Sequence, residues 1–237
     1  MSKTISIMQP YAFPYIGYFC LIEESDIFVF YDDVNYIKRG WINRNRILIN
    51  GHPHSFTIPL SKASQNELIC NIRTHSFERF KRKFLKQIHR TYRKSPFYEI
   101  GYEYIHDVLS ADHGSISDVA VRSVEKFYEM IGANKKFVRS SACFPHTRGM
   151  TRPDRLIEIT KLLHSDSYVN SIGGTELYGK DYFANKGVNL SFVRPNLKSY
   201  KQAGARDFVA GLSIIDVVMN NDIEDIKEHL QSYELVR

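Results

Sequence analysis

The chain has 237 residues, of which 43% are hydrophobic and 24% are charged, and its formal net charge is +6. These proportions are close to the averages of globular proteins and exclude a disordered, collagen-like or low-complexity chain. A chain of this length buries roughly 70% of the surface that its unfolded form exposes, so it needs neither disulfides nor a metal ion to fold. We expect a single domain over residues 1–237, within which residues 75–135 could form a helical lobe.

The longest apolar segments and the cysteines indicate where the protein works. Ile27–Tyr31 and Val209–Met219 are shorter than the roughly 20 apolar residues of a membrane-spanning helix, so we expect no stable membrane insertion. The first residues lack the long apolar segment of a signal peptide. The three cysteines are an odd number without a CxxC pair, which indicates a reducing compartment. Together these features predict a cytoplasmic protein.

The chain begins with a pattern of strand, helix and strand. Thr4–Met8 and Ile27–Tyr31 are short apolar runs typical of buried strands, and residues 15–25 between them suit a helix that begins after Pro14. Ile47–Ile49 and Ser55–Pro59 predict two further strands. Asn50-Gly51 between these two is typical of a hairpin turn.

The positive charge is concentrated in one predicted helix. Residues 79–94 contain eight Lys or Arg and no Asp or Glu, and without them the net charge of +6 becomes −2. The apolar residues of this region recur at helical spacing and form one stripe: Phe77, Phe80, Phe84, Leu85, Ile88 and Tyr92. A solvated helix face explains the cations. An anionic partner explains them as well, namely a nucleotide pyrophosphate, a nucleic acid or an anionic membrane surface.

The second half of the chain alternates between helices and strands. We predict helices over Glu99–Leu109, Ser117–Ile131, Thr151–Leu163 (with Thr151 and Asp154 as a capping box) and Tyr178–Asn185, strands over Ser167–Ser171 and Asn189–Val193, and a turn at Gly173-Gly174. This alternation predicts an α/β fold with a mainly parallel sheet, flanking helices and a helical middle segment.

Polar and aromatic residues follow the first predicted strand. Ligands of open α/β sheets gather beyond the carboxyl ends of the strands, and the N-terminus of the next helix offers N–H groups to an anion. Gln9, Tyr11 and Tyr15 can form hydrogen bonds with a polar ligand, and Gly17 permits its close approach. Core and turn packing is the alternative interpretation of these residues.

Two adjacent carboxylates, Asp32 and Asp33, follow the second strand. One of them could act as a general base, although a structural ion-pair network is the alternative. Because neighbouring residues of a strand point to opposite faces, only one of the two can meet a ligand. Downstream, Asn43, Arg44 and Arg46 concentrate hydrogen-bond donors that suit a sugar or a phosphate.

Other patterns are less informative. Gly173-Gly174 between a strand and a helix could admit a phosphate or a sugar, or form a tight turn without a ligand. His52 and His54 are the only closely spaced histidines, so we predict no metal site, and we expect no cofactor. Cys143 lies near His146, but packing explains all three cysteines.

Several blocks of the sequence resemble the WbqC-like family. They are Ile7–Phe19, Ser25–Asp33, Arg39–Ile47, Arg155–Ile157, Tyr168 with Gly173-Gly174, Tyr200–Gln202 and Leu212–Asp216. The resemblance implies a bacterial protein encoded among genes for O-antigen or other surface polysaccharides. It further implies a role in tailoring a nucleotide-linked sugar, by acylation or aminoacylation of an amino sugar.

We therefore predict a transferase that modifies the amine of a nucleotide-linked amino sugar with an activated acyl or aminoacyl donor. Asp32 or Asp33 would orient or deprotonate the amine, Arg44 and Arg46 would bind the pyrophosphate, and Gln9, Tyr15 and Asn43 would contact the sugar or the acyl group. One alternative is an ATP-using nucleotidylyltransferase or ligase-type enzyme. The opening unit is loosely similar to nucleotidylyltransferases, yet residues 14–18 lack the histidines of their HxGH signature. Another alternative is a non-catalytic sugar- or carrier-binding accessory protein.

Overall fold

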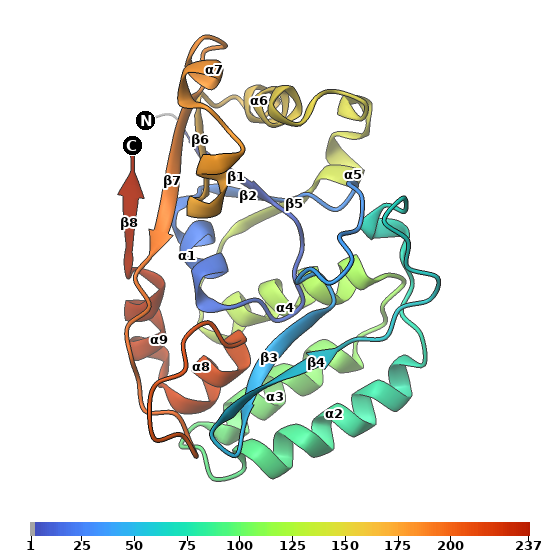
Figure 1. Cartoon of the computed structure of the whole chain (residues 1–237), viewed down its shortest axis with the longest axis vertical. Coiled ribbons are helices and arrows are strands. Elements are labelled where there is room, and N and C mark those ends of the chain that lie inside the picture. Colours follow the sequence, from blue (N-terminus) through green and yellow to red (C-terminus); the bar gives the residue numbers. More distant parts are fainter. Residues whose placement is uncertain (1–2) are drawn as a thin grey trace.

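The computed structural model describes residues 3–237, and its main sheet has six strands in the order β5-β2-β1-β6-β7-β8 (Figure 1). Their bounds are β1 Thr4–Met8, β2 Ile27–Phe30, β5 Lys136–Arg139, β6 Ser167–Ser171, β7 Asn189–Pro195 and β8 Tyr233–Val236. The first five strands in this order run parallel, and β8 is antiparallel to β7. The predicted α/β fold with a mainly parallel sheet is confirmed.

The central strands contribute side chains to two hydrophobic cores. In β2, Ile27 and Val29 belong to one core and Phe28 and Phe30 to the other, and all four are buried. A parallel strand that is covered on both faces has no solvent-facing side chains, which is why β2 has a continuous apolar sequence.

Helices cover both faces of the sheet. The larger core is completed by α1 (Ile16–Glu24), α3 (Tyr98–Ser110), α4 (Ile116–Met130), α8 (Ile214–Asn220) and α9 (Ile223–Leu230). The smaller core is completed by α6 (Arg152–Leu162) and α7 (Lys180–Ala184). In Figure 1, α6 and α4 lie on opposite sides of the sheet.

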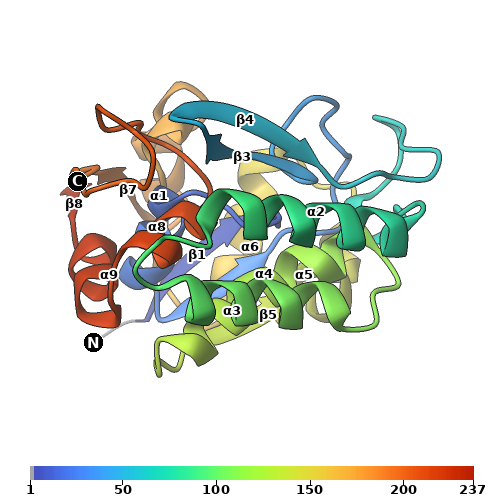
Figure 2. The ribbon, with the colours of Figure 1, turned by 90° about the horizontal axis from the view of Figure 1, so that it is seen from below.

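A separate hairpin is formed by β3 (Arg44–Ile49) and β4 (His52–Thr57). Its two turn residues have positive φ, 51° at Asn50 and 76° at Gly51, as a tight hairpin turn requires, and this confirms the predicted turn. The hairpin lies beside α2 (Phe77–Tyr92), where the rings of Phe56 and Phe84 are 4.6 Å apart (Figure 2).

Some local predictions are wrong. Gly173 and Gly174 lie in a 3-10 helix, Ile172–Glu176, rather than in a turn. Thr151 does not cap α6 through its side chain, because its hydroxyl donates to the Asp154 carboxylate at 2.6 Å. The sequence pattern missed β5 and β8, since these four-residue strands contain charged residues and lack the continuous apolar run that identifies β2. The remaining short elements are α5 (Ser140–Cys143) and the 3-10 helices Ile69–Asn71 and Pro145–Thr147.

The connections of β1 and β6 lie on opposite faces of the sheet. Helix α1 follows β1 on the side of the larger core, whereas α6 precedes β6 on the side of the smaller core. Because β1 and β6 are neighbours, their carboxyl ends flank the topological switch point, where open α/β sheets bind ligands.

Over residues 3–237, none of the helices combines the length and the apolar character that crossing a membrane requires.

Candidate ligand-binding site

A cleft of about 1080 Å³ lies at the carboxyl ends of β1, β2 and β6. Its walls come from the loop between β1 and α1, the segment after β2, the segment before α6 and the 3-10 helix after β6. Seven of the residues predicted from the sequence line it: Gln9, Tyr11, Tyr15, Gly17, Asp33, Gly173 and Gly174. Residues that are far apart in the sequence therefore meet in one cleft, which lies at the switch point of the sheet.

The aromatic side chains of the β1–α1 loop form one wall of the cleft. The ring of Tyr11 lies 5.5 Å from the ring of Tyr18, whose hydroxyl donates to the carbonyl oxygen of Gln9. The ring of Tyr15 lies across Gly17, so closely that a Cβ atom at Gly17 would be 2.4 Å from it. Gly17 is therefore needed to keep Tyr15 in this position.

Hydrogen bonds to the backbone of Phe13 hold the middle of the same loop in place. Its φ of 48° is unusual for a residue with a large side chain. Its N–H donates to Ser123 Oγ at 2.9 Å, and its carbonyl oxygen accepts from Asn45 Nδ2 and Ser213 Oγ, both at 2.7 Å. Three distant segments thus maintain a strained backbone beside the cleft, a combination that is common at functional sites.

Asp33 is paired with two arginines at the cleft wall. Its Oδ2 accepts from Arg148 Nε at 2.8 Å and from Arg155 Nη2 at 2.7 Å, and its Oδ1 accepts from Ser140 Oγ at 2.5 Å. Burial raises the pKa of the Asp33 carboxyl, but the hydrogen bonds from Ser140 and the two arginines outweigh this effect, so the pKa lies below its ordinary value.

The two arginines differ in exposure. The side chain of Arg155 is 5% exposed, donates through Nε to Thr147 Oγ1 at 2.8 Å, and lies 4.7 Å above the ring of Tyr31. The side chain of Arg148 is 44% exposed, and its bond to Asp33 uses Nε. The terminal nitrogens Nη1 and Nη2 of Arg148 can therefore still donate to a ligand in the cleft.

Tyr168 contributes a buried hydroxyl to the cleft wall. The residue is 0% exposed, its ring stacks on Phe183, and its hydroxyl has no hydrogen-bond partner among residues 3–237. Burial raises its pKa well above the ordinary value, with smaller contributions from the nearby cleft residues Tyr178 and Tyr31. A buried hydroxyl without a partner is costly, and a ligand in the cleft could supply the missing hydrogen bond once a small shift of the cleft wall exposes the hydroxyl.

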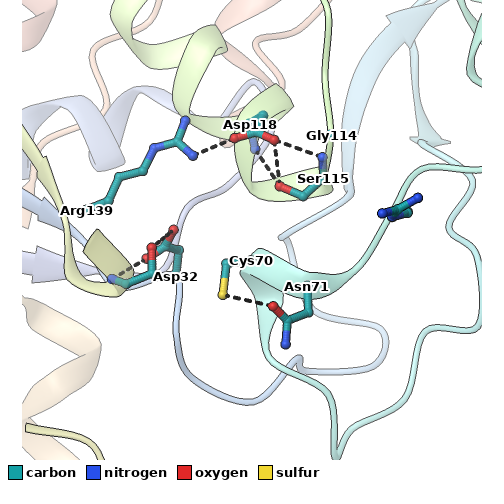
Figure 3. A pocket seen from close by; sticks show the side chains of 9 residues that line it. Asp32, Cys70, Asn71, Gly114, Ser115, Asp118 and Arg139 are labelled. Carbon is teal, nitrogen blue, oxygen red and sulfur yellow. Dashed lines mark hydrogen bonds and ion pairs between the residues drawn. The ribbon is translucent and has the colours of Figure 1, made fainter. Parts of the chain in front are cut away.

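Asp32 faces a different cavity. Its carboxylate accepts from the N–H and the hydroxyl of Ser141, both at 2.9 Å, and from Ser117 Oγ at 3.2 Å. It lines a cavity of about 570 Å³ together with Cys70 and with Asp118, which is paired with Arg139 (Figure 3). The two neighbouring carboxylates thus point to different cavities, and it is Asp33 that lines the cleft at the switch point.

Asn43, Arg44 and Arg46 lie in or next to β3, and none of these described residues lines the cleft. Asn43 is buried, accepts from Tyr36 and donates to the Ile58 carbonyl. Both arginine side chains lie over the ring of Trp41 and donate to main-chain carbonyls, Arg44 to Gly40 and Arg46 to Gly211. All three therefore have structural partners within the chain.

A buried polar network that the sequence did not reveal lies next to α8. Asp216 is 0% exposed and accepts hydrogen bonds from Tyr92, Tyr200 and Gln202 at 2.8–2.9 Å. Burial raises the pKa of the Asp216 carboxyl. The network connects α8 with α2 and with the segment after β7, so it stabilises the fold. In the sequence, these residues were indicated only by the two blocks that resemble the family, Tyr200–Gln202 and Leu212–Asp216.

Helix α2 presents its cations to solvent. The exposed cations are Arg79, Arg82, Lys83, Lys86 and Arg90 on the helix, and Arg93 and Lys94 directly after it. Lys81 is only 19% exposed and pairs with Glu78. A groove of about 360 Å³ beside α3 is lined by Arg82, Lys86, Arg90 and Tyr102, among others. This basic surface lies away from the switch-point cleft.

The metal and thiol patterns give no site of their own. Over the described range, 3–237, no three His, Cys, Asp or Glu side chains are grouped so that they could hold a metal ion. Cys20 is buried and Cys70 is half-buried in the 3-10 helix Ile69–Asn71, but Cys143 is exposed, so packing does not explain all three cysteines as expected.

The fold and the cleft define an α/β protein with a ligand site at the switch point of a mostly parallel sheet. The model of the WbqC-like protein family matches residues 9–228. The chain belongs to this family, and the match includes almost every residue of the cleft.

Two curated proteins are similar to parts of the chain. Uncharacterized protein Rv1507c from Mycobacterium tuberculosis is 43% identical over 58 residues, which are 24% of this chain and 25% of that protein. Cryptic loci regulator protein 1 from Schizosaccharomyces pombe is 35% identical over 86 residues, 34% of this chain and 7% of that protein. The chain thus matches a quarter or less of the length of these relatives. No solved structure matches it.

Proposed function

We propose that the protein is a transferase that binds a nucleotide-linked amino sugar in the switch-point cleft and transfers an acyl or aminoacyl group to its amine. The observation that carries this proposal is the pair of Asp33 and Arg148 at the cleft wall, which holds a guanidinium where a phosphate can reach it. Family membership fits this role but names no reaction.

The phosphates would be bound by cations of the cleft. Arg148, Arg152 and Lys38 all line it and are all exposed. Guanidinium groups form strong, two-pronged hydrogen bonds with phosphate oxygens. We therefore assign the phosphate contacts to Arg148 and Arg152 in place of Arg44 and Arg46, which lie in the hairpin.

Asp33 fits a positioning role better than the role of a general base. A general base works best with a pKa near the operating pH, whereas the pKa of Asp33 is lowered and its oxygens already accept three hydrogen bonds. Asp33 would hold Arg148 and Arg155 in place for the anionic ligand. Asp32 would support it indirectly, because Ser140 contacts both carboxylates.

The sugar and the reacting carbonyl of the acyl group would occupy the tyrosine side of the cleft. Tyr11, Tyr15 and Gln9 come from one wall, and the unpartnered hydroxyl of Tyr168 comes from another. Small-molecule sites are typically about 300–1000 Å³, so a cleft of about 1080 Å³ has room for a ligand as large as a nucleotide sugar.

The test is incubation of the purified protein with a panel of nucleoside-diphosphate amino sugars and acyl or aminoacyl donors, analysed by mass spectrometry. We expect an amino sugar whose mass has increased by the acyl group. Release of pyrophosphate from ATP instead would favour the nucleotidylyltransferase or ligase alternative. Binding without any product would favour the accessory protein.

The binding site is tested by calorimetry with the same nucleotide sugars. Arg148→Gln should weaken binding about 10- to 100-fold, because a charge-assisted hydrogen bond contributes about 1.5–3 kcal/mol. Arg194→Gln is the matched control, since Arg194 is also exposed and also forms one ion pair, with Glu234 on β8. Equal affinities of the two variants would contradict the proposed phosphate site.

A further inference from the structure

Exposed apolar side chains are concentrated at the cleft. Seven large hydrophobic residues are exposed among those that the structure describes, and three of them line this one cleft. These three are Ile37, 53% exposed, Met150, 42% exposed, and Leu177, 66% exposed. Single exposed apolar residues are ordinary on protein surfaces, but a group of them around one cavity marks an interaction site.

The three residues come from separate parts of the chain. Ile37 follows β2, Met150 precedes α6, and Leu177 ends the 3-10 helix after β6. Two of them have cationic cleft residues close by in the sequence: Lys38 follows Ile37, and Arg148 and Arg152 flank Met150. The cleft therefore presents apolar and positive groups together, and this combination complements a ligand that has both an anionic group and an apolar chain.

We propose that one substrate of the cleft is an amphipathic anion, whose phosphate pairs with Lys38, the exposed cleft cation that the nucleotide sugar does not use, while its apolar chain lies against Ile37, Met150 and Leu177. This inference rests on the proposed function and names the chemical class of its second substrate. Two sources share this chemistry: an acyl chain on a phosphate-bearing thioester carrier, and a lipid phosphate.

The test is calorimetry with two series of probes of increasing chain length. One series is acetyl-, butyryl- and octanoyl-coenzyme A, and the other is methyl, butyl and octyl phosphate. We expect affinity to rise about two- to fourfold for each added methylene that is buried, since burial contributes about 0.8 kcal/mol per methylene. A rise in the coenzyme A series alone identifies the thioester source, and a rise in the alkyl phosphates alone identifies the lipid phosphate. A rise in both confirms the shared chemistry.

Two surface variants test whether Leu177 and Met150 contact the apolar chain. Leu177→Ser and Met150→Ser should remove most of the dependence on chain length and leave the affinity for methyl phosphate unchanged. Both residues are exposed, so these variants are expected to fold. Leu162→Ser and Ile100→Ser are matched controls, because these residues are 39% and 43% exposed and lie outside the cleft on α6 and α3.

Two results would overturn the inference. The first is an affinity that does not depend on chain length in either series. The second is a change of oligomeric state in Leu177→Ser, measured by light scattering, with an unchanged chain-length dependence, since a second copy of the chain would then cover these residues. Neither result affects the proposed nucleotide-sugar site, whose own readout is the loss of binding in Arg148→Gln.

Discussion

The side-chain amide of Asn45 donates a hydrogen bond of 2.7 Å to the carbonyl oxygen of Phe13 and thereby connects the β3–β4 hairpin to the loop that lines the cleft. The hydroxyl of Ser213 donates to the same oxygen, also at 2.7 Å. Asn45 and Ser213 each lie within one of the sequence blocks that first suggested the family. Their contact with the cleft is indirect, because they hold the backbone that presents Tyr11 and Tyr15.

Asn45→Ala should weaken both the fold and the binding of nucleotide sugars. Removing the donor takes one of two hydrogen bonds from the buried Phe13 carbonyl, which costs about 0.5–1.5 kcal/mol of unfolding free energy. Without this bond the backbone of Phe13 should relax from its positive φ and displace Tyr11 and Tyr15. The affinity for nucleotide sugars should therefore fall even where the variant is fully folded. Denaturant unfolding and calorimetry measure the two effects.

Asn71→Ala is the control for Asn45→Ala, since the Asn71 amide is exposed and bonds only locally, to Glu67 and Cys70. We expect its stability and affinity to match the wild type. If Asn45→Ala lowered stability but bound nucleotide sugars with wild-type affinity, the hairpin would have no positioning role.

Tyr168→Phe separates a ligand role from a packing role. The Tyr168 hydroxyl has no partner among the described residues, so its removal should leave the unfolding free energy unchanged or raise it by about 1 kcal/mol. If a ligand satisfies this hydroxyl, the same change should lower affinity about tenfold. Tyr104→Phe is the contrasting variant, because the Tyr104 hydroxyl donates to the Ser123 carbonyl at 2.7 Å and should be needed for stability. Unchanged affinity in Tyr168→Phe would remove this residue from the site.

Asp33→Asn should destabilise the protein at neutral pH by about 3 kcal/mol, because it leaves the buried Arg155 without its charged partner. The pKa of Asp33 is lowered in the folded state, so its contribution is complete above the ordinary pKa of about 3.8 and is lost as the pH falls through the folded value. The difference in unfolding free energy between wild type and Asp33→Asn should therefore be constant from pH 8 to pH 5 and shrink below about pH 4.

The control for Asp33→Asn is Asp107→Asn. Asp107 also has a lowered pKa, owing first to its hydrogen bond with Lys126, but its side chain is 37% exposed, whereas that of Asp33 is 0% exposed. An exposed ion pair contributes about 0–1 kcal/mol, so this variant should stay close to the wild type. A pH-independent difference between wild type and Asp33→Asn would contradict the assigned ion pairs.

Reversal of three cations on α2 tests the basic surface. Arg82, Lys86 and Arg90 line the groove beside α3, and changing all three to Glu should cost about 0.5 kcal/mol or less each, since such surface changes are usually small. If this surface binds a polyanion, the affinity for heparin should fall steeply, and the wild-type affinity should fall with added salt. The triple reversal of Lys161, Lys201 and Arg206 is the control with the same change of charge. Equal heparin binding by both triple variants would identify the α2 cations as a solvated face.

The sequence determined the elements whose signal is local. The apolar runs of β1, β2 and β6, the Asn50-Gly51 turn and the stripe of α2 follow from side-chain periodicity and backbone preference within a few residues. Since carboxyl ends of parallel strands meet at one edge, the sequence also identified Gln9, Tyr15 and Asp33 as residues of that edge.

Only the tertiary structure decided which charges face one another. Asp33 pairs with Arg155, which is 122 residues away, and not with the arginines 11 and 13 positions downstream. It also decided that Asp32 and Asp33 line different cavities and that the hydroxyl of Tyr168 is buried in the cleft wall without a partner. Ion pairs and cavities depend on distances of a few ångströms in space, which sequence separation does not determine, whereas strands and turns depend on neighbours along the chain.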